Sequence, residues 1–147
     1  LVRKEKYELP PEAIREMIIN AHCHRNLLDE SCIQVAVYDD RLEVTSPGGL
    51  YNGLTYEEVM NGHSKIRNKA IANIFSQMGL VEAWGSGIKR ILNAAKEYGL
   101  PEPKFQEFDN MFRVELFRNF LPMTSENKHI GETSEKHRRN IGETWNS

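Results

Sequence analysis

Apolar residues recur at helical spacing in three stretches of the chain, and each stretch is predicted to form an amphipathic helix. The first opens at Pro11, because proline is tolerated in the first turn of a helix. The second ends at Gly79 and the third at Gly99, because glycine readily adopts the left-handed conformation that closes a helix. The apolar positions are Ile14, Met17, Ile18 and Ala21 in the first, Ile71, Ile74, Phe75 and Met78 in the second, and Ile88, Ile91, Leu92 and Ala95 in the third.

Alternation of apolar and polar side chains predicts two β-hairpins in addition to these helices. The paired strands are residues 33–38 and 42–45 around the turn Asp39–Asp40, and residues 105–108 and 111–117 around the turn Asp109–Asn110. In the first hairpin, Ile33, Val35 and Val37 are expected to share one buried face with Leu42 and Val44.

The order of these elements predicts a two-layer α/β sandwich of the α+β class, with the three longer helices on one face of a mixed, mainly antiparallel sheet. A short helix is expected over residues 56–60, because Thr55 and Glu58 have the spacing of a capping box. The predicted domain spans residues 1–120. Residues 121–147 carry few large apolar side chains and contain the run IGET twice, so they are expected to form a disordered linker or tail rather than a helical partner-binding segment.

Composition describes an ordinary globular chain. Its 147 residues suit one domain, and its hydrophobic content of 39% and charged content of 27% are normal for a soluble protein. A formal net charge of −2 without a dense lysine–arginine block does not predict nucleic-acid binding. Cys23 and Cys32 lack metal-ligand spacing, and no apolar run could span a membrane, so a cytoplasmic protein with reduced thiols is expected. The start at Leu1 indicates a piece cut from a longer protein.

Two polar side chains lie one turn apart on the first predicted helix. Glu16 and Asn20 are four residues apart, so a carboxylate and an amide point the same way. Together with His24 they form a polar row along the edge of the apolar stripe. Such oxygen ligands suit Mg²⁺, which keeps several waters beside a polyphosphate. The alternative is a pair of solvated surface residues, and the other motifs decide between the two. His22 and His24 point in different directions on a helix, which disfavours a zinc site.

Two glycine-rich loops follow, SPGGL at residues 46–50 and GSGI at residues 85–88. The second precedes a helix, where N–H groups and the helix dipole favour a phosphate. Each could also be a simple tight turn, and neither matches the Rossmann or P-loop pattern. Arg67 could reach a phosphate or lie on the surface, and Asn68 is expected to cap the second amphipathic helix.

Taken in order, these parts resemble the GHKL ATPase fold of gyrase, histidine kinases and MutL. More closely, five segments resemble the C-terminal domain of bacterial proteins described as RecG-like ATP-dependent DNA helicases. Many of those proteins are also called transcriptional regulators and carry an N-terminal AlbA- or Schlafen-type domain. The segments are AIREMIINAHCHR, DDRLEVTSPGGL, RNKAIANIF, GLVEAWGSGIKRI and GLPEPKF, within about residues 7–118. The chain has neither a P-loop nor a DEAD-type carboxylate pair, so helicase activity by this fragment is not expected.

The resemblance implies roles for individual residues. Asn20 would hold magnesium, and Glu16 would orient or deprotonate the water that attacks ATP. The nucleotide would be lined by Ser46, Gly48, Gly49, Gly85 and Gly87. Ser46 stands where the family has an aspartate that binds the adenine amino group, and a neutral acceptor is weaker than a charged one. Cys23–His24 replace the acidic residue usual after the asparagine, and the second glycine box is abbreviated. Slow ATP hydrolysis is therefore the most that is expected.

The sequence leaves two functions to compare. The first is an ATP-binding sensor domain that dimerises or changes shape with nucleotide and controls a DNA-binding module elsewhere in the full-length protein. The second is an interaction or dimerisation module that keeps the fold without ATP turnover. The spacing of Glu16 and Asn20 favours the first, whereas Ser46 and the short glycine boxes favour the second. Direct DNA binding by this fragment is disfavoured by its net charge.

Overall fold

The computed structural model of the protein describes residues 5–51, 53–81 and 86–119. Helices and strands alternate along these residues. In chain order they are α1 (Pro11–His24), β1 (Gln34–Val37), β2 (Arg41–Pro47), α2 (Tyr56–Met60), α3 (Lys69–Gln77), α4 (Gly87–Glu97), β3 (Lys104–Phe108) and β4 (Met111–Phe117). The predicted tail over residues 121–147, with its IGET repeat, lies outside the described residues.

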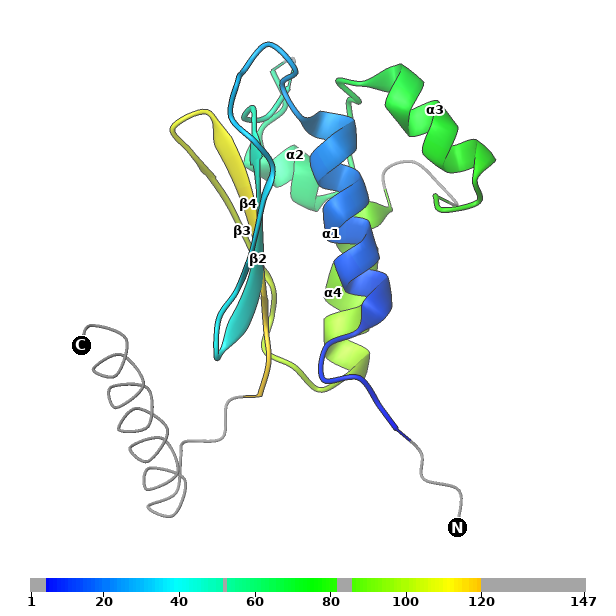
Figure 1. The fold of residues 1–147 in the computed structure, drawn as a ribbon, viewed down its shortest axis with the longest axis vertical. Helices are drawn as coiled ribbons and strands as arrows, with labels where there is room; N and C mark the ends of the chain where they lie inside the picture. Colours follow the sequence, from blue (N-terminus) through cyan, green and yellow to red (C-terminus); the bar gives the residue numbers. More distant parts are fainter. Residues whose placement is uncertain (1–4, 52, 82–85, 120–147) are drawn as a thin grey trace, which may run out of the picture.

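The four described strands form one sheet in the order β1-β2-β4-β3, and every pairing in it is antiparallel. Figure 1 shows α1 and α4 side by side along one face of this sheet, with α3 packed beside the upper part of α1. The predicted two-layer α/β sandwich with a mainly antiparallel sheet is confirmed. No helix in the described ranges is long and apolar enough to cross a membrane.

The main core lies between α1, α4 and the central strands β2 and β4. Met17, Ile91 and Leu116 are its largest fully buried apolar side chains. A second cluster joins α1 to α3 and consists of Ile19, Cys23, Ala72 and Val81. Burial raises the pKa of the Cys23 thiol to about 11, so this thiol stays protonated and acts as an apolar group near neutral pH.

Local sequence signals place several element ends as predicted. In the capping box before α2, the Glu58 amide donates to the Thr55 hydroxyl at 3.2 Å, and the Thr55 amide donates to the Glu58 carboxylate at 2.8 Å. Between β3 and β4, Asp109 and Asn110 both adopt positive φ, 47° and 57°. Two successive residues of this kind give the turn whose twist matches a two-residue hairpin.

The prediction that Val35 and Val37 are buried is wrong. The register places them opposite Val44 and Leu42, so they do lie on the helix-bearing face of the sheet. However, β1 is the edge strand and the helices pack over the centre of the sheet, which leaves the two valines 52% and 76% exposed.

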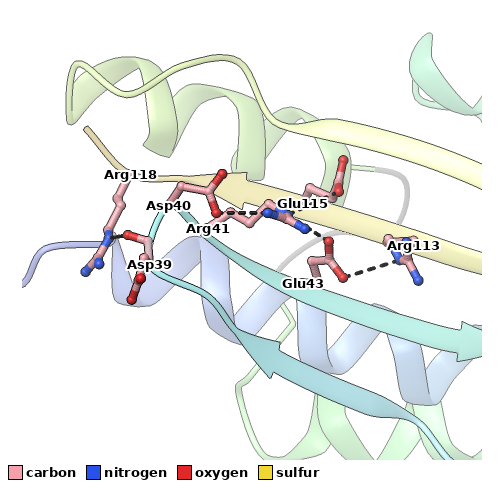
Figure 2. Close-up of polar contacts among 7 residues, drawn as sticks. All are labelled: Asp39, Asp40, Arg41, Glu43, Arg113, Glu115 and Arg118. Atoms are coloured by element: carbon pink, nitrogen blue, oxygen red, sulfur yellow. Dashed lines mark hydrogen bonds and ion pairs between the residues drawn. The ribbon is translucent and has the colours of Figure 1, made fainter. Parts of the chain in front are cut away.

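The opposite face of the sheet carries a buried charge network that the sequence did not reveal (Figure 2). Glu43 and Glu115 lie opposite each other on β2 and β4, and both are buried. Arg41 donates to Glu43 at 2.8 Å and lies 3.5 Å from Glu115, while Arg113 lies 3.6 Å from Glu43. Burial opposes ionisation of Glu43, but hydrogen bonds from Arg41 and Glu115 and the charge of Arg113 hold its pKa below the ordinary range.

Replacing Glu115 with glutamine is expected to remove a pH dependence of folding. Burial, followed by the hydrogen bond and charge of Glu43, raises the pKa of Glu115 above its ordinary value of 4.5. The folded state therefore holds this proton more tightly than the unfolded chain, and stability should fall as the pH rises from 4.5 through the raised pKa. Glu115→Gln cannot ionise, so its free energy of unfolding, measured by urea denaturation, should vary less across that window.

Glu43→Gln tests the partner carboxylate, whose hydrogen bond and charge help to raise the pKa of Glu115. It removes the carboxylate that accepts from Arg41 and pairs with Arg113, and it should lower the free energy of unfolding by about 1–3 kcal/mol at neutral pH. A wild-type stability curve as flat as that of Glu115→Gln above pH 4.5 would contradict the assignment of the raised pKa to Glu115.

Candidate functional site

Helix α1 presents Glu16 and Asn20 directly to the first turn of α4. Both side chains point from consecutive turns of α1 toward Gly87, the residue with which α4 begins. A Cβ at Gly87 would collide with Glu16 Oε1 and would lie 2.7 Å from Asn20 Nδ2 and 3.2 Å from Asn20 Oδ1. Glycine is therefore required for α4 to approach these two side chains so closely.

The glycine turn after β2 is fixed by backbone contacts from two sides. The Gly48 amide donates to the Asn110 carbonyl at 2.6 Å, and the Asn26 amide donates to the Pro47 carbonyl at 2.7 Å. Gly48 adopts a φ of 103°, which other residues rarely adopt, and a Cβ there would lie 3.0 Å from Asn26. The turn is thus held against the α1–β1 loop on one side and the β3–β4 turn on the other.

One cavity brings these parts together. Its lining includes six of the residues predicted from the sequence: Glu16, Asn20, Ser46, Gly48, Gly49 and Gly87. The sheet and α4 supply an apolar floor with Val44, Ile91, Phe112 and Val114, and the segment around α2 supplies Leu54, Val59, His63 and Lys65. Gly85 lies outside the described residues.

The electrostatics of the cavity are dominated by one buried carboxylate. Glu16 is only 6% exposed, and burial raises its pKa, against the opposing effect of Arg90 3.7 Å away. Burial also lowers the pKa of His24, and the charge of Arg67 lowers it further, so this imidazole is neutral at pH 7. A carboxylate with a raised pKa in a cavity is a better proton acceptor than an exposed one.

Ser46 is buried in the cavity, and its hydroxyl donates to the Ala21 carbonyl at 2.9 Å. The hydroxyl proton is therefore directed at the backbone of α1. The oxygen of Ser46 keeps acceptor capacity, and toward a ligand it would act as a hydrogen-bond acceptor.

Arg67 and Asn68 make contacts that differ from the simplest sequence interpretations. Arg67 is not an isolated surface residue, because its guanidinium donates to the carbonyls of His24 and Gly49, each at 3.0 Å. Asn68 does occupy the N-cap position of α3, but its side chain makes no capping bond there. It donates instead to the carbonyls of His22 and Arg25 at the end of α1. The side chain of Asn68 thus binds carbonyls more than 40 residues away in the chain instead of a nearby amide of α3. A sequence pattern confined to neighbouring residues cannot reveal such a partner.

Sequence reasoning also missed Arg90 and the cavity residues His63 and Lys65. Arg90 lies three residues after Gly87, so it shares a helical face with that glycine, and this spacing could have identified it as a partner of Glu16. His63 and Lys65 belong to a stretch without periodicity, which indicated only a loop.

The described residues contain no group of three or more histidine, cysteine, aspartate or glutamate side chains placed to hold a metal ion. A cation bound in this cavity would therefore take few protein ligands, with the Asn20 amide oxygen as the predicted one, and the rest from water and from the molecule bound with it. This ligand set fits Mg²⁺, which binds oxygen and usually keeps several waters.

Comparison with known proteins identifies the family of this chain. Residues 30–116 match the family described as "Putative ATP-dependent DNA helicase recG C-terminal". Among solved structures, the fold is similar to that of the DIP2311 protein from Corynebacterium diphtheriae, with a TM-score of 0.72 and 31% sequence identity. That match covers 80% of this chain and 24% of the other, so this chain spans about a quarter of the length of that protein. No curated protein matches the chain. Because the family model covers more than half of the sequence, this chain belongs to the RecG C-terminal domain family.

Proposed function

We propose that this domain binds a magnesium–nucleotide complex, with ATP as the nucleotide, in the cavity between α1, the glycine turn and the start of α4. The observation that carries the proposal is the convergence of the Glu16 carboxylate and the Asn20 amide on Gly87, where a Cβ has no room. A family described as ATP-dependent supports nucleotide as the ligand class.

The residues around the cavity fit such a ligand. Asn20 offers an amide oxygen to the cation. Gly48, Gly49 and Gly87 line the cavity beside it, and Gly85 would join them by family resemblance. The apolar floor suits a flat base, and Ser46 can accept a hydrogen bond from an exocyclic amino group.

Each side chain then has a defined task. Bound magnesium would neutralise polyphosphate charge. Glu16 would orient a water and accept its proton, because burial has raised its pKa. Arg90 limits that rise and holds the carboxylate in place from α4.

For the whole protein, we propose a sensor role: nucleotide binding by this domain controls a DNA-binding module elsewhere in a cytoplasmic protein, with a homodimer as one form of the response. The match to a protein of which it covers only 24% supports the presence of other domains. The alternative is an interaction module that binds without turnover. Ser46 favours this alternative, because a neutral hydroxyl directed at Ala21 holds a base less strongly than a carboxylate would.

Asn20→Ala is expected to weaken binding of magnesium–ATP by about tenfold, because it removes one cation ligand and leaves the rest of the cavity intact. Isothermal titration with a non-hydrolysable ATP analogue, with and without magnesium, measures this. The matched control is Asn93→Ala on the exposed side of α4, which should bind as wild type does. The weakening should disappear when magnesium is omitted.

Two results would separate the candidate functions. Binding without phosphate release by the wild type would support the interaction module with a retained nucleotide site. No binding of any magnesium–nucleotide complex at millimolar concentration would overturn the nucleotide proposal and leave only the fold.

A further inference from the structure

Arg67 connects three parts of the nucleotide cavity through one side chain. Its Nε donates to the His24 carbonyl at the end of α1, and its Nη2 donates to the Gly49 carbonyl in the glycine turn. Its guanidinium carbon also lies 4.7 Å from the centre of the Tyr51 ring. A planar guanidinium can satisfy such divergent acceptors together, whereas a single ammonium group cannot.

The next residue, Asn68, ties the same end of α1 to the start of α3. Its side-chain amide donates to His22 at 3.0 Å and to Arg25 at 2.7 Å, and its backbone amide donates to Cys23 at 2.9 Å. Four consecutive carbonyls of α1, from residue 22 to residue 25, thus bind either Arg67 or Asn68. Orphan carbonyls at a helix end need such partners, and here the two residues that directly precede α3 supply them.

Within the described residues, the main packing contact of α3 is with α1. Ala72 packs with Ile19 and Cys23 of α1 in the second apolar cluster, while Ile74 and Met78 are mostly exposed. The position of α3 therefore depends on its contact with α1 and on the hydrogen bonds from Arg67 and Asn68 to the carbonyls of residues 22–25, here called the Arg67–Asn68 junction.

We infer that Arg67 and Asn68 couple occupancy of the nucleotide cavity to the position of α3, with Arg67 as a positioning residue; this inference rests on the proposed nucleotide site. A Cβ at Gly48 would lie 3.2 Å from Arg67 Nη2, so an anion that approaches the glycine turn also approaches this guanidinium. An anion competes with the Gly49 and His24 carbonyls for the N–H donors of Arg67, because a guanidinium binds a charged oxygen more strongly than a neutral carbonyl oxygen. Any movement of Arg67 passes along the chain to Asn68 and the first turn of α3.

The test is hydrogen exchange of α3 amides in the intact chain, with and without a magnesium–ATP analogue. In the wild type, binding should change the exchange rate at residues 72–75 by about fivefold or more, which is the lower range of ordinary coupling between sites. Arg67→Lys keeps the charge but cannot bind both carbonyls, so at a saturating concentration of the analogue it should lose the change in α3. Asn68→Ala should also lose the ligand-induced change in α3, because it removes the side-chain hydrogen bonds to the His22 and Arg25 carbonyls.

Arg15→Lys on the exposed side of α1 is the matched control and should behave as wild type. A merely structural role for Arg67 would speed exchange in α3 equally with and without ligand, and would leave the ligand-induced difference intact; that result would overturn the inference. Wild-type binding with no change in α3 would also overturn it while the nucleotide site stands. If no nucleotide binds at all, both the site and the coupling are wrong.

Discussion

Glu16→Gln is expected to bind magnesium–ATP as the wild type does and to release phosphate about 10²–10⁴ times more slowly, the usual contribution of a positioned proton acceptor. Glutamine has nearly the same shape and can still orient a water, but it cannot take up a proton. Because burial raises the pKa of Glu16, the wild-type rate should fall on the acidic side at a pH above the ordinary 4.5. The variant should lack this acidic limb.

Steady-state phosphate release and analogue titration, measured on the same samples, test this expectation. Glu12→Gln is the matched control, because Glu12 is exposed in the first turn of α1 and lies outside the cavity lining. If Glu16→Gln kept wild-type turnover, the proton acceptor would have to be another group. If its binding were lost together with turnover, Glu16 would act mainly on the ligand and not on the water.

The features that sequence predicts well here are those fixed by short-range contacts. The capping box at Thr55 and Glu58 and the left-handed pair Asp109–Asn110 each involve neighbours in the chain, and the structure places both as predicted. The spacing of Glu16 and Asn20 is likewise set within one helix. Their meeting with Gly87 could be expected only through family resemblance, because nothing local relates residues 20 and 87.

The features that sequence predicts poorly depend on which parts of the chain cover others. Val35 and Val37 alternate as a buried strand should, yet the strand order places β1 at an edge that the helices do not reach. Glu43 and Glu115 stand at positions that a half-exposed strand normally gives to solvent, but both are buried and form ion pairs with Arg41 and Arg113. Asn68 occupies the N-cap position of α3, but its side chain donates to carbonyls at the end of α1 and not to an amide of α3.

Gly87→Ala is expected to weaken nucleotide binding about tenfold, as Asn20→Ala does, while the protein stays folded. The added methyl group would meet Glu16 Oε1 and the Asn20 amide, which are the ends of flexible side chains rather than backbone atoms. These ends can turn aside at small cost, and alanine is favoured over glycine in a helix by about 1 kcal/mol, so the free energy of unfolding should change little. The site does not recover in the same way, because the Asn20 amide can no longer reach the cation, and about 1.4 kcal/mol of lost interaction is tenfold in affinity.

Gly99→Ala provides the opposite result and completes the test. Gly99 ends α4 with a φ of 67°, and a Cβ added to it would have nothing within 4 Å, so alanine there strains the backbone without touching the cavity. It should lower the free energy of unfolding by about 1–2 kcal/mol and leave affinity unchanged. Denaturation and titration of both variants therefore separate stability from binding. Wild-type affinity in Gly87→Ala would show that Glu16 and Asn20 need not hold their present positions, and the proposed site would have to be given up.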